Sequence, residues 1–354
     1  MDFDVIVIGA GPAGATAAKV LAEKGISVVL IDKQTFPRDK PCGGGLSVKA
    51  LARYPYLEKH QLIDSYSYNC CIHTSSLKHV VNIMKNKPIW AMVLRKKFDA
   101  GLVTIAAASG AVVQSGKKVV QLKTNVEQAE ITLHDGSSIK ASFVIASDGM
   151  WSTMTKQVGE PQNIQNTGIC VVGEIPVKNQ IINQWFSEKH CVHIHKNIFG
   201  IPGYGWVFPK QEHLNIGIGV FRHVITSNHE KNLRTLYAQY FHLLKETNIL
   251  PKEINIGPIN GGVFPTLPMQ RTYRTRIVFC GDAGGLTNPL TGEGIYYAML
   301  SGEIASKIIA NALTNSVFDE RALSIYQHEW IHEFGNMHKL RRFSSMVLYR
   351  LYPF

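Results

Sequence analysis

Three glycines and an acid near the start of the chain have the types and spacing of a dinucleotide-binding site. Gly9, Gly11 and Gly14 directly follow a short apolar run, and Asp32 ends the next one. Glycines permit a tight turn, let the backbone approach a pyrophosphate and allow the following helix to pack closely on the strand. The helix directs its positive end at the phosphates, and the acid binds ribose hydroxyls. An acid at this position suits FAD or NAD rather than NADP.

The elements that would position these residues follow from the apolar pattern. Residues 5–8 are continuously apolar, which is typical of a strand buried on both faces of a parallel sheet. Alanines and a leucine predict a helix that Gly25 ends, and residues 27–31 predict the second strand. Strand, turn, helix, strand and acid in register indicate a dinucleotide-binding βαβ unit more specifically than the glycines alone.

Two later segments repeat the pattern of a buried strand that ends at an acid and a glycine. Residues 143–149 contain one such strand with an Asp-Gly pair, and residues 276–282 contain another with a Gly-Asp pair. A glycine-rich turn then opens a helix within residues 292–313. Both segments are therefore expected to return to the nucleotide-binding sheet.

Residues 168–221 contain several strand-like runs that predict an antiparallel layer, and residues 228–248 predict a helix. We expect an α/β (α+β) fold in which a discontinuous Rossmann-like domain carries an inserted antiparallel-sheet substrate domain. The expected boundaries are 1–70, 95–165 and 270–313 for the nucleotide-binding domain, 71–94 and 166–269 for the substrate domain, and 314–354 for a C-terminal helical segment.

The cysteines and two neighbouring histidines do not predict a metal site. The six cysteines show no CxxC spacing, so neither a zinc site nor a disulfide framework is indicated, and a reducing, cytoplasmic compartment fits best. His193 and His195 share one face of a predicted strand, but no third ligand follows at a suitable spacing. We therefore expect no metal and interpret the histidines as part of a solvated strand face.

The charge of the chain is strongly basic. Its 354 residues carry a formal net charge of +11, with lysines and arginines scattered through most of the sequence, so we expect no nucleic-acid partner. Residues 339–351 interleave basic and apolar side chains, which fits either peripheral contact with an anionic membrane or a terminal helix docked on the core. No apolar stretch is long enough to span a bilayer, so we expect a soluble or peripheral protein.

The three strand-ending segments together resemble the flavoprotein fold of the p-hydroxybenzoate hydroxylase type. Within that fold the chain is more similar to the geranylgeranyl reductases, over the motifs at residues 37–44, 204–209 and 281–295. Gly284 and Gly285 stand where hydroxylases usually continue with alanine and histidine, which weighs against a hydroxylase.

This resemblance implies that the cofactor is FAD and indicates which residues hold it. Arg95 would reach the phosphate or ribose region, Asp282 would bind the ribityl chain, and the helix after Gly294 would direct its positive end at the flavin ring between the two layers. The residues expected to bind FAD are Gly9, Gly11, Pro12, Ala13, Gly14, Asp32, Lys33, Arg38, Cys42, Gly43, Gly44, Arg95, Asp148, Gly149, Gly281, Asp282, Pro289, Gly292, Glu293, Gly294 and Ile295.

The resemblance also implies a reaction, the saturation of C=C bonds of geranylgeranyl chains by hydride transfer from reduced flavin. Cys42, Tyr204 and Trp206 are the expected catalytic residues. The aromatic residues of the second motif, including Phe208, alternate along one strand and would line an apolar slot, while Cys42 would gate or tune the site. Tyr204 or an ordered water would supply the proton. The residues alone also fit three core aromatics and a buried structural thiol.

Two other functions remain open from the sequence. One is a flavin-dependent monooxygenase that acts on an aromatic or other apolar substrate, and the other is a non-catalytic protein that binds flavin or prenyl lipid. A halogenase is disfavoured because residues 203–209 lack the tryptophan pair of its motif. The expected partner is an isoprenoid or prenylated lipid, and NAD(P)H or a ferredoxin would supply electrons, since no second complete dinucleotide motif is visible.

Overall fold

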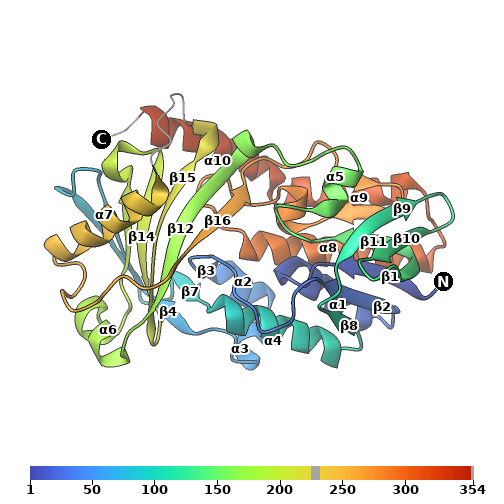
Figure 1. Ribbon diagram of the computed structural model, residues 1–354, viewed down its shortest axis with the longest axis horizontal. Helices are drawn as coiled ribbons and strands as arrows, with labels where there is room; N and C mark the ends of the chain where they lie inside the picture. Colours follow the sequence, from blue (N-terminus) through green and yellow to red (C-terminus); the bar gives the residue numbers. More distant parts are fainter. Residues whose placement is uncertain (225–231, 352–354) are drawn as a thin grey trace. The chain divides into compact units, whose positions relative to one another are not determined.

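The chain forms two compact units, each assembled from three stretches of sequence (Figure 1). The first unit comprises Met1–Arg38, Asp99–Asn166 and Phe264–Arg342, and the second comprises Asp39–Phe98, Thr167–Val263 and Phe343–Phe354. The structure is a computed structural model that describes residues 1–224 and 232–351.

The first unit is built on a largely parallel sheet with the strand order β17-β18-β11-β1-β2-β8. The four pairings from β18 to β8 are parallel, and a hairpin of β9 and β10 continues from β11 in antiparallel register. The continuously apolar strands β1 and β2 are buried, as a sheet covered on both faces requires. The strands are β1 Phe3–Ile8, β2 Val28–Asp32, β8 Val112–Ser115, β9 Val119–Thr124, β10 Ala129–Leu133, β11 Ser138–Ala146, β17 Tyr273–Arg274 and β18 Ile277–Phe279.

Helix α1 (Pro12–Ala22) packs against α8 (Ile295–Thr314) at very short range in the first unit. A Cβ added at Gly302 of α8 would lie 2.2 Å from the carbonyl oxygen of Ala13. Ser306 Oγ donates a hydrogen bond to the carbonyl oxygen of Ala17 at 3.1 Å. The two helices can therefore approach this closely only because glycine stands at position 302.

The remaining helices of this unit include two that cross its boundaries, α4 at its start and α10 near its end. They are α4 Arg95–Ala108, α5 Thr153–Gln157, α9 Glu320–Trp330 and α10 Asn336–Met346, with 3₁₀ turns at η1 Ile164–Asn166 and η4 Gly281–Gly284 and a π-helical turn at η5 Ile331–Gly335. A further π-helical turn, η6 Val347–Leu351, ends the described chain.

The second unit is built on an antiparallel sheet with the strand order β16-β12-β15-β14-β13-β5-β6, in which only the β13–β5 pairing is recorded as parallel among the described residues. A small sheet, β3-β7-β4, accompanies it. The strands are β3 Gly45–Ser47, β4 Ser65–Ser67, β5 Asn69–His73, β6 Val80–Met84, β7 Trp90–Met92, β12 Thr167–Pro176, β13 Val192–Lys196, β14 Gly203–Pro209, β15 His213–Phe221 and β16 Ile259–Pro265.

Helix α7 (Leu233–Glu246) packs over β12 and β15 on one face of the large sheet (Figure 1). Its Tyr240 is fully buried, and the ring occupies the space that a side chain at Gly205 would need, 2.6 Å from the position of a Cβ. The other helical segments of this unit are α2 Val48–Arg53, α3 Tyr56–Lys59, α6 Asn179–Phe186, and the 3₁₀ turns η2 Ile198–Gly200 and η3 Arg222–Val224.

The expected fold class is confirmed, while the unit boundaries differ from the expected domain boundaries, most of all over two stretches. Residues 39–70 fall in the second unit because β3 and β4 both pair with β7. Residues 314–342 fall in the first unit, where Tyr326 OH donates to the carbonyl oxygen of Phe279 at 2.9 Å. The helix expected over 228–248 begins at Leu233, and its expected first residues, 228–231, lie outside the described residues, as do residues 352–354.

The contact at Gly302 predicts that replacing this helical glycine with alanine destabilises the protein. Gly→Ala in a helix interior ordinarily stabilises it by about 1 kcal/mol. At position 302 we expect Gly302→Ala to lower the free energy of unfolding by about 1–3 kcal/mol, because the added methyl group forces α1 and α8 apart. Urea unfolding measures the difference, with Gly261→Ala as a control whose Cβ would lie 3.9 Å from its nearest neighbour. A variant at least as stable as the parent would contradict the packing argument.

Candidate functional site

The glycine turn of the first unit combines a tight backbone bend with one open position. Gly9 has φ +93°, and a Cβ there would lie 2.4 Å from the carbonyl oxygen of Ser147. A Cβ at Gly14 would lie 1.9 Å from the carbonyl oxygen of Gly9, so both positions accept only glycine. At Gly11, by contrast, the nearest atom to an added Cβ is Arg38 Nη2 at 3.7 Å. The turn is therefore open toward a ligand at Gly11, where α1 begins.

Asp32 stands at the end of β2 and joins that strand to the glycine turn. Its Oδ2 accepts a hydrogen bond from the amide of Ala10 at 2.7 Å, and its Oδ1 accepts one from the amide of Gln34 at 2.8 Å. An ionised carboxylate offers about four lone-pair sites. Two acceptor sites therefore remain for the hydroxyls of a ribose. Lys33, which was also expected to bind the cofactor, is solvent-exposed.

Arg38 brings a positive charge beside the open glycine. Its Nη2 lies 3.1 Å from Oδ2 of Asp99, a fully buried carboxylate on α4, and its guanidinium stacks 5.2 Å from the centroid of Phe36. Both contacts fix the direction of the Arg38 side chain. The sequence predicted Arg38 as a cofactor-binding residue but not its orientation. Asp99 itself was not predicted from the sequence, since an acid inside an apolar helix pattern carries no distinctive spacing.

The Gly-Asp turn after β18 lies against both α1 and α8. A Cβ at Gly281 would lie 3.2 Å from Cβ of Ala13 and 3.3 Å from Cβ of Ala298. Asp282 Oδ1 accepts a hydrogen bond from Thr287 Oγ1 at 3.2 Å. Gln162, which the sequence did not single out, donates from Nε2 to the carbonyl oxygen of Ala283 at 2.9 Å. The turn is thus held from several sides.

The start of α8 lies next to this turn. Gly294 precedes the helix at Ile295, and a Cβ at Gly294 would lie 3.6 Å from Oδ1 of Asp282. The first turn of the 20-residue helix contains no acidic residue, so its positive end is not neutralised from within the helix. Glu293 is half-buried and precedes it, while Pro289 lies in the preceding turn.

Three other expected cofactor residues are Asp148, Gly149 and Arg95. Asp148 Oδ2 accepts a hydrogen bond from the amide of Thr153, at the start of α5, at 2.8 Å, while burial raises the pKa of the Asp148 carboxyl. Gly149 makes the bend that follows. Arg95 is buried and opens α4 within the stretch that belongs to the second unit.

In the second unit, the three expected aromatics share one face of β14. The ring centroids of Tyr204 and Trp206 lie 5.6 Å apart, and those of Trp206 and Phe208 lie 6.0 Å apart. The indole of Trp206 lies across β15, where a Cβ at Gly217 would come within 2.0 Å of it. Because α7 packs on the opposite face at Gly205, these rings form an apolar surface on the face away from α7.

A buried polar network links this aromatic face to the glycine-rich loop that contains Cys42. Asn215 Oδ1 accepts from Trp206 Nε1 at 2.8 Å, and Asn215 Nδ2 donates to the carbonyl oxygen of Cys42 and to Glu174 Oε2, both at 3.0 Å. The fully buried Lys210 donates from Nζ to Glu174 Oε2 at 2.6 Å. The network therefore fixes the backbone of the loop relative to the aromatic face.

The loop itself also packs closely on this face. A Cβ at Gly43 would lie 3.0 Å from the ring of Phe208, and one at Gly44 would lie 2.2 Å from the carbonyl oxygen of Val93. The Cys42 thiol is half-buried and accepts a weak hydrogen bond from the amide of Gly44 at 3.3 Å. Gly44, with φ +73°, leaves no room for a side chain, and Gly43 lets the loop pack closely against the ring of Phe208.

The sequence did not identify Asn215, Glu174 or Lys210. Glu174 and Asn215 are direct partners across β12 and β15, so the only available signal was a polar residue within each apolar strand. Such a residue predicts a buried hydrogen-bonding network in general, but not its partners.

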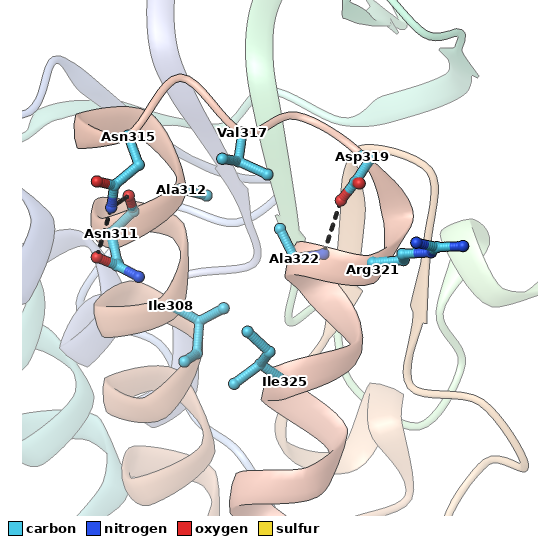
Figure 2. Close-up of a pocket in the computed structure, with 9 residues that line it drawn as sticks. All are labelled: Ile308, Asn311, Ala312, Asn315, Val317, Asp319, Arg321, Ala322 and Ile325. Carbon is cyan, nitrogen blue, oxygen red and sulfur yellow. Dashed lines mark hydrogen bonds between the residues drawn. The ribbon is translucent and has the colours of Figure 1, made fainter.

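A surface pocket of the first unit lies between the end of α8 and the start of α9 (Figure 2). Asp319 accepts from the amide of Ala322 at 2.9 Å and caps α9, while Asn315 Nδ2 donates to Asn311 Oδ1 at 2.8 Å. These polar groups serve helix ends, and no cofactor residue expected from the sequence lines the pocket. Its lining residues are Ile308, Asn311, Ala312, Asn315, Val317, Asp319, Arg321, Ala322 and Ile325.

Comparison with known proteins supports a flavoprotein. A family model described as an FAD binding domain matches residues 2–330. The chain is 30% identical to digeranylgeranylglycerophospholipid reductase 1 of Methanosphaera stadtmanae, over 92% of this chain and 80% of that protein. It is 29% identical to menaquinone reductase of Mycolicibacterium smegmatis, over 87% of this chain and 76% of that protein.

Solved structures agree on the fold. A geranylgeranyl bacteriochlorophyll reductase-like protein from Thermoplasma acidophilum superposes with a TM-score of 0.86 at 23% identity, covering 99% of this chain and 88% of the other. A mutant of the halogenase PltM in complex with FAD superposes with a TM-score of 0.77 at 16% identity, covering 98% of this chain and 76% of the other.

The polar network predicts that Asn215 contributes strongly to stability. In Asn215→Ala, the Trp206 indole N–H and the Cys42 carbonyl lose a buried partner, which should lower the free energy of unfolding by about 2 kcal/mol or more. Urea unfolding followed by tryptophan fluorescence measures this. The matched control is Asn82→Ala, because Asn82 is exposed on β6 of the same sheet. Equal effects of the two substitutions would refute the network's role.

Proposed function

Because this chain belongs to the geranylgeranyl reductases, a family of FAD-dependent oxidoreductases, we propose that it saturates C=C bonds of an isoprenoid chain carried by a lipid. The observation that carries the proposal is the apolar face of Tyr204, Trp206 and Phe208, which a buried polar network joins to the Cys42 loop. An isolated alkene offers no polar handle, so an apolar surface is the recognition element that such a substrate requires.

The first unit has the groups that the ADP part of FAD needs. The turn is open at Gly11, the Arg38 guanidinium stands beside it, and two acceptor sites of Asp32 remain for ribose hydroxyls. The residues therefore fit the cofactor. We assign the phosphate contacts to the start of α1 and the ribityl contacts to Asp282.

Bound FAD in its reduced form would supply the hydride for the alkene. The positive end of α8, whose first turn contains no acidic residue, favours negative charge beside it by about 1 kcal/mol and so would stabilise an anionic reduced ring. Tyr204 and Trp206 would hold the isoprenoid chain and exclude water, and Cys42 would shape the slot. The proton for the second alkene carbon would come from the Tyr204 hydroxyl or from water.

The electron donor would be NAD(P)H or a ferredoxin. The net charge of +11 favours association with an acidic protein or with anionic headgroups.

A single-turnover experiment tests the reductase. The purified protein is reduced chemically without oxygen and mixed with a geranylgeranylated glycerophospholipid, and flavin absorbance and lipid mass are followed together. We expect flavin reoxidation with a gain of two hydrogens per event. Trp206→Ala should lower the rate by about tenfold or more, whereas Trp185→Ala, which removes an indole on α6 that is 37% exposed, should not.

The alternatives give a different result in the same experiment. Flavin that stays reduced until oxygen enters, with the lipid mass unchanged, would overturn the reductase and favour a monooxygenase or a non-catalytic lipid-binding protein. Oxygen uptake stimulated by an aromatic substrate would then identify the monooxygenase.

We also propose that α10 contacts the surface of a membrane. Met337, Leu340 and Phe343 are 49, 58 and 60% exposed and follow one another at intervals of three residues, so they share one side of the helix. Arg341 and Arg342 instead donate hydrogen bonds to the Tyr297 hydroxyl and the Thr266 carbonyl. The exposed side of α10 therefore carries these three apolar side chains, with Lys339 exposed beside them. No helix in the described residues is long and apolar enough to cross a bilayer.

Vesicle co-sedimentation tests this contact. The double variant Leu340→Ser, Phe343→Ser should bind vesicles that contain anionic lipid at least about tenfold more weakly, because burying two large apolar side chains contributes about 3 kcal/mol or more. The control is Val126→Ser, which removes a side chain that is 80% exposed in the β9–β10 turn. Unchanged binding by the double variant would favour a terminal helix that only docks on the core.

A further inference from the structure

Five side chains that can ligate metals lie on one face of two neighbouring strands in the second unit. Cys71 and His73 are two residues apart on β5, and His193 and His195 are two residues apart on β13, so each pair projects from one face. The parallel register places His193 opposite Cys71 and His195 opposite His73. Cys191, two residues before His193, joins the same face.

Three of these residues converge on one point. The Sγ atoms of Cys71 and Cys191 lie 3.0 Å apart, and these two atoms and a ring nitrogen of His193 all lie within 4.8 Å of one another. In a tetrahedral zinc site, bond lengths of about 2.3 Å to sulfur and 2.0 Å to nitrogen place the ligand atoms about 3.5–3.8 Å apart. The three donors therefore need to shift only slightly to take up an ion.

The surroundings hold the histidine in a suitable orientation. His193 Nδ1 is hydrogen-bonded to His73 Nε2 at 3.0 Å, which leaves His193 Nε2 for a metal. Metal-ligating histidines nearly always use their second nitrogen in such a bond. The ring of Phe186, on α6, packs edge-on against His193 at 5.8 Å between centroids. His195 in turn is tied to the buried Tyr240 hydroxyl through Nδ1, at 2.7 Å.

Charge and access also suit a metal. A neutral imidazole has a lone pair to donate to a metal ion. Cys71, Cys191 and His193 are each only half-buried, which leaves a route for an ion and for one water molecule. Two thiolates would balance the charge of a divalent ion.

We propose that Cys71, Cys191 and His193 bind one Zn²⁺ ion, with water in the fourth position and His73 as the positioning residue for His193. Two sulfur donors and one imidazole are a ligand set that zinc prefers. On binding, both thiols release their protons to solvent and form Zn–S bonds, with no change of oxidation state. The ion would tie β5 to the start of β13 across 120 residues of sequence. The site goes beyond the reductase activity and does not depend on it.

Metal titration of the holoenzyme tests the site. The protein is purified under reducing, anaerobic conditions, stripped with a chelator and titrated with Zn²⁺, and bound metal is measured by mass spectrometry after desalting. We expect one Zn²⁺ per chain, and a sulfur-to-cobalt charge-transfer band when Co²⁺ replaces it, read as a difference spectrum against the metal-free protein. Cys71→Ser and Cys191→Ser should each abolish stoichiometric binding and the band. His73→Ala should weaken binding by about 10–100-fold.

Cys70 offers a matched control within the same strand. Its side chain projects from the opposite face and packs with Met92 and Val192, so Cys70→Ala should bind Zn²⁺ like the parent. Metal retained in both Cys71→Ser and Cys191→Ser would show adventitious binding and overturn the proposal. No Zn²⁺ uptake, together with two fewer titratable thiols than the six in the sequence when the protein is purified without a reductant, would overturn it in favour of a disulfide between Cys71 and Cys191.

Discussion

The close contact of α1 with α8 is the constraint on which the first unit depends. Gly302 removes the side chain that would collide with the Ala13 carbonyl, and Gly281 fits between Ala13 and Ala298. The turn that begins α1, the Gly-Asp turn and the start of α8 therefore lie around one small region, although they are nearly 300 residues apart in the sequence. A dinucleotide needs contacts for its phosphates and for its sugar chain at fixed separation, and tight helix packing provides that rigidity.

In the first unit close helix packing holds the site residues in place, and in the second unit a buried hydrogen-bonding network does so. The amide of Asn215 connects Trp206 to the backbone of the Cys42 loop, and it is held by the Glu174 carboxylate, which the fully buried Lys210 also contacts. Each of these groups is costly to bury without a partner, so an arrangement that satisfies several of them together is strongly preferred over a shifted loop. Apolar contacts alone would specify the position of the Cys42 loop poorly. The network therefore fixes this loop next to the aromatic face.

Fold similarity by itself does not select the reaction. The same architecture occurs in halogenases and in a geranylgeranyl reductase-like protein, both at low sequence identity. The reductase assignment comes from relatives that match over most of the chain, and it agrees with the aromatic side chains on β14. Flavoproteins of one fold share the residues that bind the cofactor. They differ in the residues that contact the substrate.

The sequence by itself determined the features that depend on neighbouring residues. The glycine turn, the acid at Asp32, the strand-ending Gly-Asp pair and the alternation of Tyr204 with Trp206 are local patterns. They were enough to predict the fold class and a dinucleotide, and the family resemblance of the motifs indicated FAD. Tertiary structure decided which distant residues meet. Asp99 pairs with Arg38, Asn215 holds the Cys42 loop, and Cys191 lies beside Cys71. It also assigned residues 39–70 to the second unit, through strands of three residues. Such pairings depend on strand register and side-chain direction across long separations, and neither leaves a spacing that can be read along one chain.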